Sequence, residues 1–174
     1  MPFIYVVGPA GSGKSALAML LRARGFKAYD EDDPDVGSAH SLETGEPVTI
    51  PPLDKRDADW FSRHEWRVRE SAKSRLTSLA TTQPVILFGN SVKPSEQAAL
   101  FDRVIYLNID EDTLRERILK RADNDYGKSE DEMQRILEQK QASDNQYSIS
   151  GALPIDATQP LEVVADAIER IVAS

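Results

Sequence analysis

The fold is decided by residues 8–15, which read Gly8-Pro9-Ala10-Gly11-Ser12-Gly13-Lys14-Ser15. This stretch satisfies the pattern G-x-x-x-x-G-K-[S/T] in full. The apolar run of residues 3–7 precedes it and is typical of a strand buried on both faces. From Lys14 onward apolar residues recur at helical spacing as far as Gly25, a residue suited to end a helix. A strand, a glycine-rich turn and a helix in this order are the context in which the pattern binds phosphate.

The residue types in this stretch fit the binding of a polyphosphate. Glycines permit backbone conformations and close approaches that a β-carbon forbids, so successive N–H groups can point at phosphate oxygens. A helix that begins near Gly13 adds unsatisfied N–H groups and the positive end of its dipole. Lys14 can reach the β- and γ-phosphates, and the Ser15 hydroxyl can bind magnesium. We therefore predict that residues Gly8 to Ala16 bind ATP with Mg²⁺, the alternative being a glycine-rich turn that matches by chance.

The composition argues against several other classes of protein. The 174 residues suffice for one domain, and 40% hydrophobic with 29% charged residues is ordinary for a globular protein. The sequence has no cysteine, and its two histidines are too few for a histidine-rich metal site. A net charge of −8 argues against nucleic acid or an anionic membrane as a partner. Because the N-terminus lacks the basic region of a signal peptide and no apolar run reaches the roughly 20 residues of a membrane span, we expect a cytoplasmic protein.

Downstream, short apolar runs alternate with helical patterns, which predicts βαβ units and a parallel sheet. The segment of residues 34–53 contains prolines and glycines and is expected to be irregular. Ser129 and Glu132 predict a capping box at the start of a helix. The expected strands cover residues 27–29, 84–88, 103–109 and 152–155, and the expected helices cover about 57–79, a short stretch after residue 94, 111–122, 129–145 and 161–172.

Beyond the loop, the sequence resembles the small P-loop phosphotransferases, a group that includes adenylate kinase and shikimate kinase. It is most similar to the adenylate-kinase-like ATP-binding proteins, which are often described only as nucleoside or nucleotide kinases. The resemblance implies one α/β domain over residues 1–174, with the three-layer P-loop NTPase fold. It further implies a five-stranded parallel sheet of order 2-3-1-4-5 with helices on both faces. An acceptor-side insertion at about 31–80 and a short lid at about 122–130 complete the expected fold.

Residues 114–121, which read LRERILKR, look like the helix that enters the lid in adenylate kinases. By that match Arg117 lies against the adenine, and Arg121 points at the phosphoryl group that is transferred. A guanidinium can stack on a flat base and can also form two hydrogen bonds to phosphate oxygens. The alternative is a solvated helix face on which both arginines pair with Glu111, Asp112 or Glu116. The preceding phosphate loop favours the catalytic interpretation, because phosphoryl transfer requires additional positive charge.

Two loops complete the expected nucleotide site. In the short lid, Gly127 is expected to act as a hinge and Lys128 to reach the phosphates on closure, although a plain polar loop is the alternative. This lid is shorter than the long lids of adenylate kinases and lacks their paired arginines. The loop of residues 156–160 is similar to the one that wraps the adenine in this group. The positions that the resemblance assigns to the adenine are Thr158, Gln159 and Pro160, and the alternative is a plain strand-to-helix turn with the proline at its first helical position.

The acidic run after the second expected strand resembles the D-x-D motif of shikimate-kinase-like enzymes. It lies at the carboxyl edge of the sheet, where open α/β folds bind ligands. By this match Asp30 holds the magnesium or orients the attacking hydroxyl group, and Asp32 contacts the acceptor. A carboxylate here can accept the proton of the acceptor as its oxygen attacks phosphorus. Glu31 and Asp33 are expected to belong to a solvated acidic turn.

The acceptor site departs from that of adenylate kinases, which carry an Asp-Gly pair after the third strand. Residues 87–91 read LFGNS and contain no carboxylate, but the Gly89-Asn90 turn can offer backbone N–H groups and a side-chain amide. The segment before it supplies cations and aromatic rings able to hold an anionic or planar acceptor. This set comprises Arg56, Arg63, His64, Trp66, Arg67 and Arg69, of which Arg63, Trp66 and Arg67 are the candidate acceptor-binding residues; Trp60 and Trp66 can equally be core residues.

Two functions follow from these observations. The first is a kinase that moves the γ-phosphoryl group of ATP to a small-molecule acceptor, such as a nucleoside, a nucleotide or a similar metabolite. The second is an ATPase or nucleotide-dependent switch that acts with a protein partner, which the missing carboxylate and the unusual segment 34–56 favour slightly. A lid with arginines favours the kinase, because a lid keeps water away from the phosphates. A GTPase is disfavoured since the sequence has no Asn-Lys-x-Asp motif.

Overall fold

The computed structural model describes residues 1–52, 58–122 and 126–174. Arg56 and residues 123–125 of the expected lid lie outside the described residues. The strands are β1 (Phe3–Val7), β2 (Lys27–Asp30), β3 (Gly37–Ser41), β4 (His64–Val68), β5 (Val85–Phe88), β6 (Arg103–Asn108) and β7 (Leu153–Asp156). The helices are α1 (Lys14–Ala23), α2 (Ala58–Arg63), α3 (Glu70–Ala80), α4 (Pro94–Leu100), α5 (Glu111–Lys120), α6 (Glu130–Ile149) and α7 (Leu161–Ala173).

Five strands form a parallel sheet in the order β2-β5-β1-β6-β7. These labels differ from the expected order 2-3-1-4-5 because β3 and β4 intervene in the chain and form a sheet of their own. Strand β1 is buried along its whole length, as its apolar sequence predicts for the centre of a covered sheet. All five strands therefore end at one edge, and the loops that follow them meet there.

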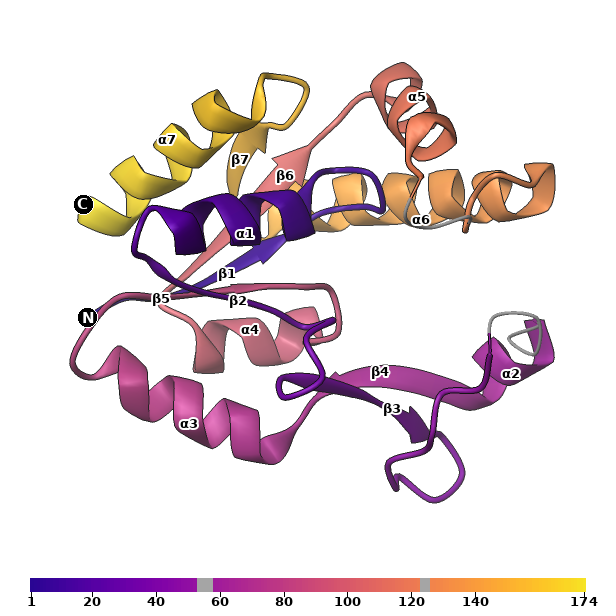
Figure 1. Cartoon of the computed structure of the whole chain (residues 1–174), viewed down its shortest axis with the longest axis horizontal. Helices are drawn as coiled ribbons and strands as arrows, with labels where there is room; N and C mark the ends of the chain where they lie inside the picture. Colours follow the sequence, from indigo (N-terminus) through magenta and orange to yellow (C-terminus); the bar gives the residue numbers. More distant parts are fainter. Residues whose placement is uncertain (53–57, 123–125) are drawn as a thin grey trace.

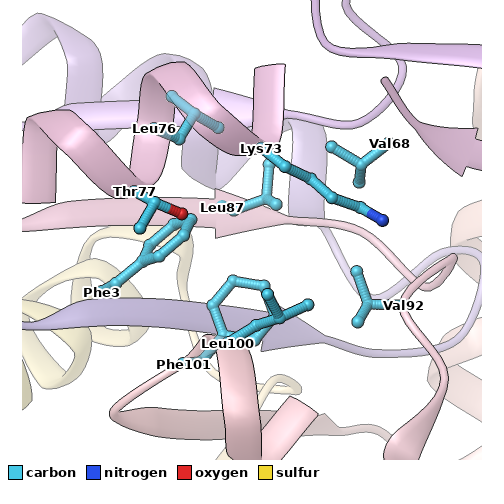
Figure 2. Close-up of a pocket in the computed structure, with 9 residues that line it drawn as sticks. All are labelled: Phe3, Val68, Lys73, Leu76, Thr77, Leu87, Val92, Leu100 and Phe101. Atoms are coloured by element: carbon cyan, nitrogen blue, oxygen red, sulfur yellow. The ribbon is translucent and has the colours of Figure 1, made fainter. Parts of the chain in front are cut away.

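Helices cover both faces of the sheet, and each face has its own apolar core (Figure 1). The side chains of β1 alternate between the two cores, so that Ile4 and Val6 face α1 and α7 while Phe3 and Tyr5 face α3 and α4. Figure 2 shows the second core, where aromatic and aliphatic side chains surround a cavity of about 10 Å³. This volume accommodates about one water molecule, so the cavity is a packing defect rather than a ligand site.

The antiparallel pair β3–β4 corrects two sequence expectations. The single helix expected over residues 57–79 is wrong, because residues 64–68 form β4 between α2 and α3. Residues 37–41, expected to be irregular, pair with β4 as β3. The helical spacing of Trp60 and His64 suggested one continuous helix, but residues 64–68 are extended and pair with β3. Val68 turns into the core beneath the main sheet, while Trp66 reaches the end of β2.

The predicted helix ends are only partly correct. Gly25 follows α1 with φ +91°, and its N–H and that of Phe26 satisfy carbonyls of the last turn, as expected for a glycine at this position. The hydroxyl of Ser129 accepts a hydrogen bond from the N–H of Glu132. The carboxylate of Glu132 accepts from the N–H of Gly127 at 2.9 Å, so the capping box differs from its expected reciprocal form. Within the described residues, none of the helices has the length and apolar character of a membrane span.

Candidate functional site

A cavity of about 990 Å³ opens at the carboxyl edge of the parallel sheet. The loop after β1, the ends of β2 and β5, strand β4 and helix α5 all contribute side chains to it. Ligands of open α/β sheets bind at this edge. The residues that line the cavity are Ala10, Gly11, Gly13, Lys14, Ser15, Ala16, Asp30, Glu31, Asp32, Glu65, Trp66, Gly89, Asn90, Ser91, Lys93, Arg117, Arg121, Tyr126 and Gln139.

The loop between β1 and α1 has the conformation that its glycines predict. Gly11 and Gly13 have φ values of +82° and +93°, which residues with a β-carbon rarely adopt. Gly13 occupies the N-cap position of α1, and no side chain of the described residues forms a hydrogen bond to cap this helix. The first turn also contains no acidic residue. The N-terminal amides and the positive end of the dipole are thus left for an anion.

Lys14 is held inside the loop by main-chain carbonyls. Its Nζ donates hydrogen bonds to the carbonyl oxygens of Gly8 at 2.5 Å and Pro9 at 3.1 Å. Burial of the ammonium group lowers the pKa of Lys14 to about 8, although the negative charges of Asp30 and Asp32 oppose this shift. Burial therefore disfavours the charged form of Lys14 in the cavity. A bound polyphosphate would stabilise that charge. Ser15 follows it with an exposed side chain.

Asp30 and Asp32 line the same cavity, at the carboxyl edge of the sheet where they were expected. Asp30 is only 6% exposed, and its Oδ1 accepts a hydrogen bond from the N–H of Asp32 at 3.0 Å. Burial and then repulsion by Asp30 raise the pKa of Asp32. Asp33 accepts a hydrogen bond from the N–H of Asp30 and pairs with Arg22, so it supports this turn and is not simply solvated as expected.

Glu31 corrects the expectation of a solvated turn, because its side chain is 3% exposed. Its Oε1 accepts a hydrogen bond from the hydroxyl of Tyr5 at 2.7 Å. Its Oε2 accepts from the N–H groups of Asn90 and Ser91, both at 2.9 Å. Burial raises the pKa of this carboxyl group, and the hydrogen bonds oppose the shift. A carboxylate therefore does bind the turn after β5, but it belongs to Glu31, which follows β2.

Asn90 also has a role that differs from the expected one. Its side-chain Nδ2 donates to the carbonyl oxygen of Gly8 at 2.8 Å, and the N–H of Gly8 donates to its Oδ1 at 3.2 Å. The side-chain amide of Asn90, which was expected to bind an acceptor, is thus bonded to the phosphate loop. The main-chain N–H of Asn90 donates to Glu31. Gly89 has no room for a side chain, since a β-carbon there would lie 1.9 Å from Cδ of Glu31. Gly89 and Asn90 line the cavity, and their contacts join the turn after β5 to Glu31 and to the phosphate loop.

Arg117 and Arg121 both reach the cavity from the C-terminal half of α5. The Nη2 of Arg117 donates to the carbonyl oxygen of Thr158 at 3.4 Å, which joins the two segments that were assigned to the adenine. Arg121 donates to the carbonyl oxygen of Tyr126.

The loop after β7 uses its polar side chains internally. The Thr158 hydroxyl and the Gln159 amide donate to the carboxylate of Asp156. Pro160 is the N-cap residue of α7, one position before the helix begins, and none of the three lines the cavity.

The structure brings only one of the three candidate acceptor-binding residues of α2 and β4 into the cavity. Trp66 lines it, and its Nε1 donates to the carbonyl oxygen of Glu31 at 2.9 Å. Arg63 is exposed and pairs with Asp59 at 2.5 Å within α2. Arg67 pairs with Glu65, its neighbour on the same side of β4. Neither Arg63 nor Arg67 lines the cavity, and nearby carboxylates pair with both of them.

Five cavity-lining residues were given no role from the sequence, namely Glu65, Ser91, Lys93, Tyr126 and Gln139. Tyr126 precedes the expected hinge glycine and could have been found from that position. Gly127 itself is buried with φ +93°, and a β-carbon there would lie 2.7 Å from the side chain of Ile136. This glycine packs against helices α5 and α6 in the structure.

Oxygen ligands for a divalent cation are present but few. The Ser15 hydroxyl and the Asp30 carboxylate line the same cavity, and both are ligands that Mg²⁺ accepts. Among the described residues, no group of three histidine or acidic side chains is arranged to hold a metal ion alone. This donor set fits a cation that shares its coordination with phosphate oxygens and water.

The family comparison extends over most of the chain. A model of the AAA domain family matches residues 4–138. No curated protein matches the sequence.

Solved structures of small-molecule kinases are similar in fold. A deoxyadenosine kinase from M. mycoides shares 14% identity with a TM-score of 0.58, with 98% of each chain covered. A shikimate kinase from Acinetobacter baumannii shares 21% identity with a TM-score of 0.60, over 99% of this chain and 93% of that one. A gluconokinase from Sinorhizobium meliloti shares 21% identity with a TM-score of 0.55, over 99% of this chain and 94% of that one. The fold is that of the P-loop small-molecule kinases.

Proposed function

The chain belongs to the AAA domain family, and from this premise we propose that it is an ATP-dependent kinase acting on a small-molecule acceptor. One observation carries the proposal: Lys14 in the phosphate loop and the two carboxylates Asp30 and Asp32 line a single cavity at the carboxyl edge of the sheet. The loop supplies a site for the polyphosphate, and the carboxylates supply a site for a hydroxyl group. The structural neighbours named above phosphorylate or bind small molecules, which supports the same conclusion.

The proposed reaction is an in-line phosphoryl transfer. The oxygen of the acceptor hydroxyl group forms a bond to the γ-phosphorus, and the bond from that phosphorus to the β–γ bridging oxygen breaks. ADP leaves with the electron pair of that bond. The proton of the hydroxyl group passes to the carboxylate of Asp30, which retains one oxygen that is not bonded to the N–H of Asp32. Mg²⁺, if held by the Ser15 hydroxyl and, through a water molecule, by Asp30, would neutralise negative charge on the phosphates.

Positive charge surrounds the proposed path of the phosphoryl group. Lys14 would leave the carbonyls of Gly8 and Pro9 to contact the β- and γ-phosphates. Arg121 would approach the γ-phosphate, and Arg117 would lie against the adenine beside Thr158. Asp32 would hold the acceptor. In the same proposal, residues 31–80 form the acceptor side, and residues 122–130 form a short lid that limits access of water.

A coupled assay of ADP release tests this function. The purified chain is given Mg²⁺ and ATP, with a panel of nucleosides, nucleoside monophosphates, sugars and hydroxy acids. We expect at least one acceptor to raise ADP release strongly and to appear as its phosphate ester by mass spectrometry. Lys14→Met should abolish this turnover, whereas Lys27→Met, on the exposed end of β2, should not. Equal ADP release with and without every acceptor would instead assign an ATPase or a nucleotide-dependent switch.

A further inference from the structure

A second cavity of about 450 Å³ adjoins the proposed acceptor site. Asp32 and Trp66 line both cavities, so that the two are continuous around these side chains. The second cavity lies between the loop after β2 and the segment after β3, where Val48, Thr49 and Ile50 contribute to its wall. None of these three residues was a candidate from the sequence.

The indole of Trp66 is fixed where the two cavities meet. Its Nε1 donates a hydrogen bond to the carbonyl oxygen of Glu31, and Glu31 is itself held by three hydrogen bonds through its carboxylate. Gly37 makes this approach possible, since a β-carbon there would lie 2.4 Å from Nε1 of the indole. A ligand that passes from Asp32 into the second cavity therefore meets a flat aromatic surface in a defined position. Such a surface favours a planar or apolar portion of a ligand.

The charges along this path offer little attraction for an anion. Of the described cations expected near the acceptor, Arg63 and Arg67 are paired with carboxylates. Arg69 lines the second cavity, where its Nε donates to the carbonyl oxygens of Pro34 and Gly37. Asp32 lines the same cavity, so the lining carries one negative charge for this positive one.

Asp30 and Asp32 both line the main cavity, where Lys93 is the lining cation not assigned above to ATP. Asp32 and Lys93 are both exposed, so solvent screens both charges, whereas Asp30 is buried. Like charges that share a cavity repel each other. A phosphate or carboxylate on the acceptor would add to the charge of the γ-phosphate in the same space.

We propose that the acceptor is a hydroxyl compound without a phosphate or carboxylate group, and that its planar or apolar portion extends past Trp66 into the second cavity. The inference rests on the proposed kinase function and specifies its substrate class. The hydroxyl group that receives the phosphoryl group lies near Asp30 and Asp32, while the rest of the molecule contacts the indole and the wall formed by Val48 and Ile50.

Matched pairs of acceptors that differ by one anionic group test the charge requirement. The pairs are adenosine and its 5′-monophosphate, sorbitol and gluconate, and methyl shikimate and shikimate. In the pair that supports turnover, the uncharged member should have a KM at least tenfold below that of its anionic partner. Lys27→Ala, at an exposed position that lines neither cavity, is the control and should change this KM by less than about threefold. A lower KM for the anionic member overturns the inference but leaves the kinase assignment standing, whereas a panel without any acceptor-dependent turnover overturns both.

Variants that fill the second cavity test its role separately. Thr49→Trp should raise the KM for the uncharged acceptor at least tenfold, while the KM for ATP and the ADP release without acceptor stay within twofold. Ile50→Trp should act in the same way and covers the case in which the first variant fails to fold, which circular dichroism detects. Thr44→Trp is the matched control, because Thr44 is exposed on the same segment and lines neither cavity. An unchanged acceptor KM in a folded Thr49→Trp or Ile50→Trp variant overturns the assignment of this cavity.

Discussion

The side-chain amide of Asn90 pairs with both main-chain polar groups of Gly8, donating to its carbonyl oxygen at 2.8 Å and accepting from its N–H at 3.2 Å. This pairing ties the first residue of the phosphate loop to the turn after β5, 82 positions away in the chain. The carbonyl oxygen of Gly8 also accepts from Nζ of Lys14. When Lys14 turns toward a polyphosphate, the asparagine keeps this carbonyl bonded, so the loop need not rearrange.

Asn90→Ala should weaken ATP binding because it removes the two hydrogen bonds that join Gly8 to the turn after β5. Each of the two lost hydrogen bonds costs about 1 kcal/mol, so we expect the affinity for ATP to fall by up to about thirtyfold. Isothermal calorimetry with Mg²⁺ and a non-hydrolysable ATP analogue measures the change. Asn145→Ala, at an exposed position of α6, is the control. An affinity equal to that of the wild type would show that the pairing does not position the loop.

The lowered pKa of Lys14 predicts proton uptake on nucleotide binding. Burial lowers this pKa to about 8 in the free protein, and a bound triphosphate would raise it, since an opposite charge favours the ammonium form. Below pH 8 the lysine is already protonated, so affinity is constant with respect to this group. Above pH 8 the affinity should fall by up to about tenfold per pH unit, with uptake of one proton. Calorimetry at pH 9 in two buffers of different ionisation enthalpy measures this uptake.

Lys14→Arg supplies the control for that pH dependence. Its guanidinium remains charged throughout this range, so the fall in affinity and the proton uptake should both disappear. If the wild type binds at pH 9 without taking up a proton, the lysine is not the group that faces the phosphates.

Glu31 predicts a large difference between two substitutions at one position. Glu31→Ala removes the acceptor of the Tyr5 hydroxyl and of two main-chain N–H groups, which should lower the free energy of unfolding by about 3 kcal/mol or more. Glu31→Gln keeps the shape and one oxygen, and should cost about 1 kcal/mol. Because burial raises the pKa of Glu31, the wild type loses its advantage over the glutamine variant as the pH rises above 4.5. Urea unfolding from pH 4 to 7 measures these differences, and Glu43→Ala is the exposed control.

Gly89 and Glu31 should show strong coupling in a double-mutant cycle. A β-carbon at position 89 would lie 1.9 Å from Cδ of Glu31, so Gly89→Ala should cost about 3 kcal/mol of unfolding free energy. Truncation of Glu31 to alanine makes room for that carbon, so the double variant should lose much less than the sum of the single variants. Gly25→Ala, where nothing lies within 4 Å of the added carbon, should show only its backbone cost of about 1–2 kcal/mol. Simple additivity of the first pair would argue against a direct clash.

The fold was largely predictable because its strands are apolar and its phosphate loop is local. Residues 3–7 and 85–88 are continuous apolar runs, which indicate buried parallel strands without any knowledge of their partners. Strands β3 and β4 have mixed polar sequences, and Trp60 and His64 repeat at a helical interval, so local pattern favoured a helix. Only the pairing of residues 37–41 with 64–68 shows that residues 64–68 form a strand and not part of a helix.

In the candidate site, the phosphate loop was predictable because its pattern is local, whereas contacts between distant residues were not. Gly8 to Ser15 form a motif whose geometry depends on its own residues. The role of Glu31 depends on Tyr5 and Asn90, 26 and 59 positions away, and adjacent acidic residues gave no sign of which one is buried. Arg63 and Arg67 were assigned to an acceptor by charge alone, and local carboxylates hold them instead.

Arg117 contacts the carbonyl oxygen of Thr158 in the loop that was assigned to the adenine, so its substitution tests that assignment. If Arg117 lies against the adenine, Arg117→Ala should raise the KM for ATP about tenfold and change kcat by less than about threefold. The affinity of this variant for inorganic tripolyphosphate, which has no base, should not change. Arg115→Ala on the same helix is the control and should alter neither the KM for ATP nor the affinity for tripolyphosphate. A variant with unchanged KM and a greatly lowered kcat would place this guanidinium at the γ-phosphate. In that case tripolyphosphate, too, should bind the variant more weakly than it binds the wild type.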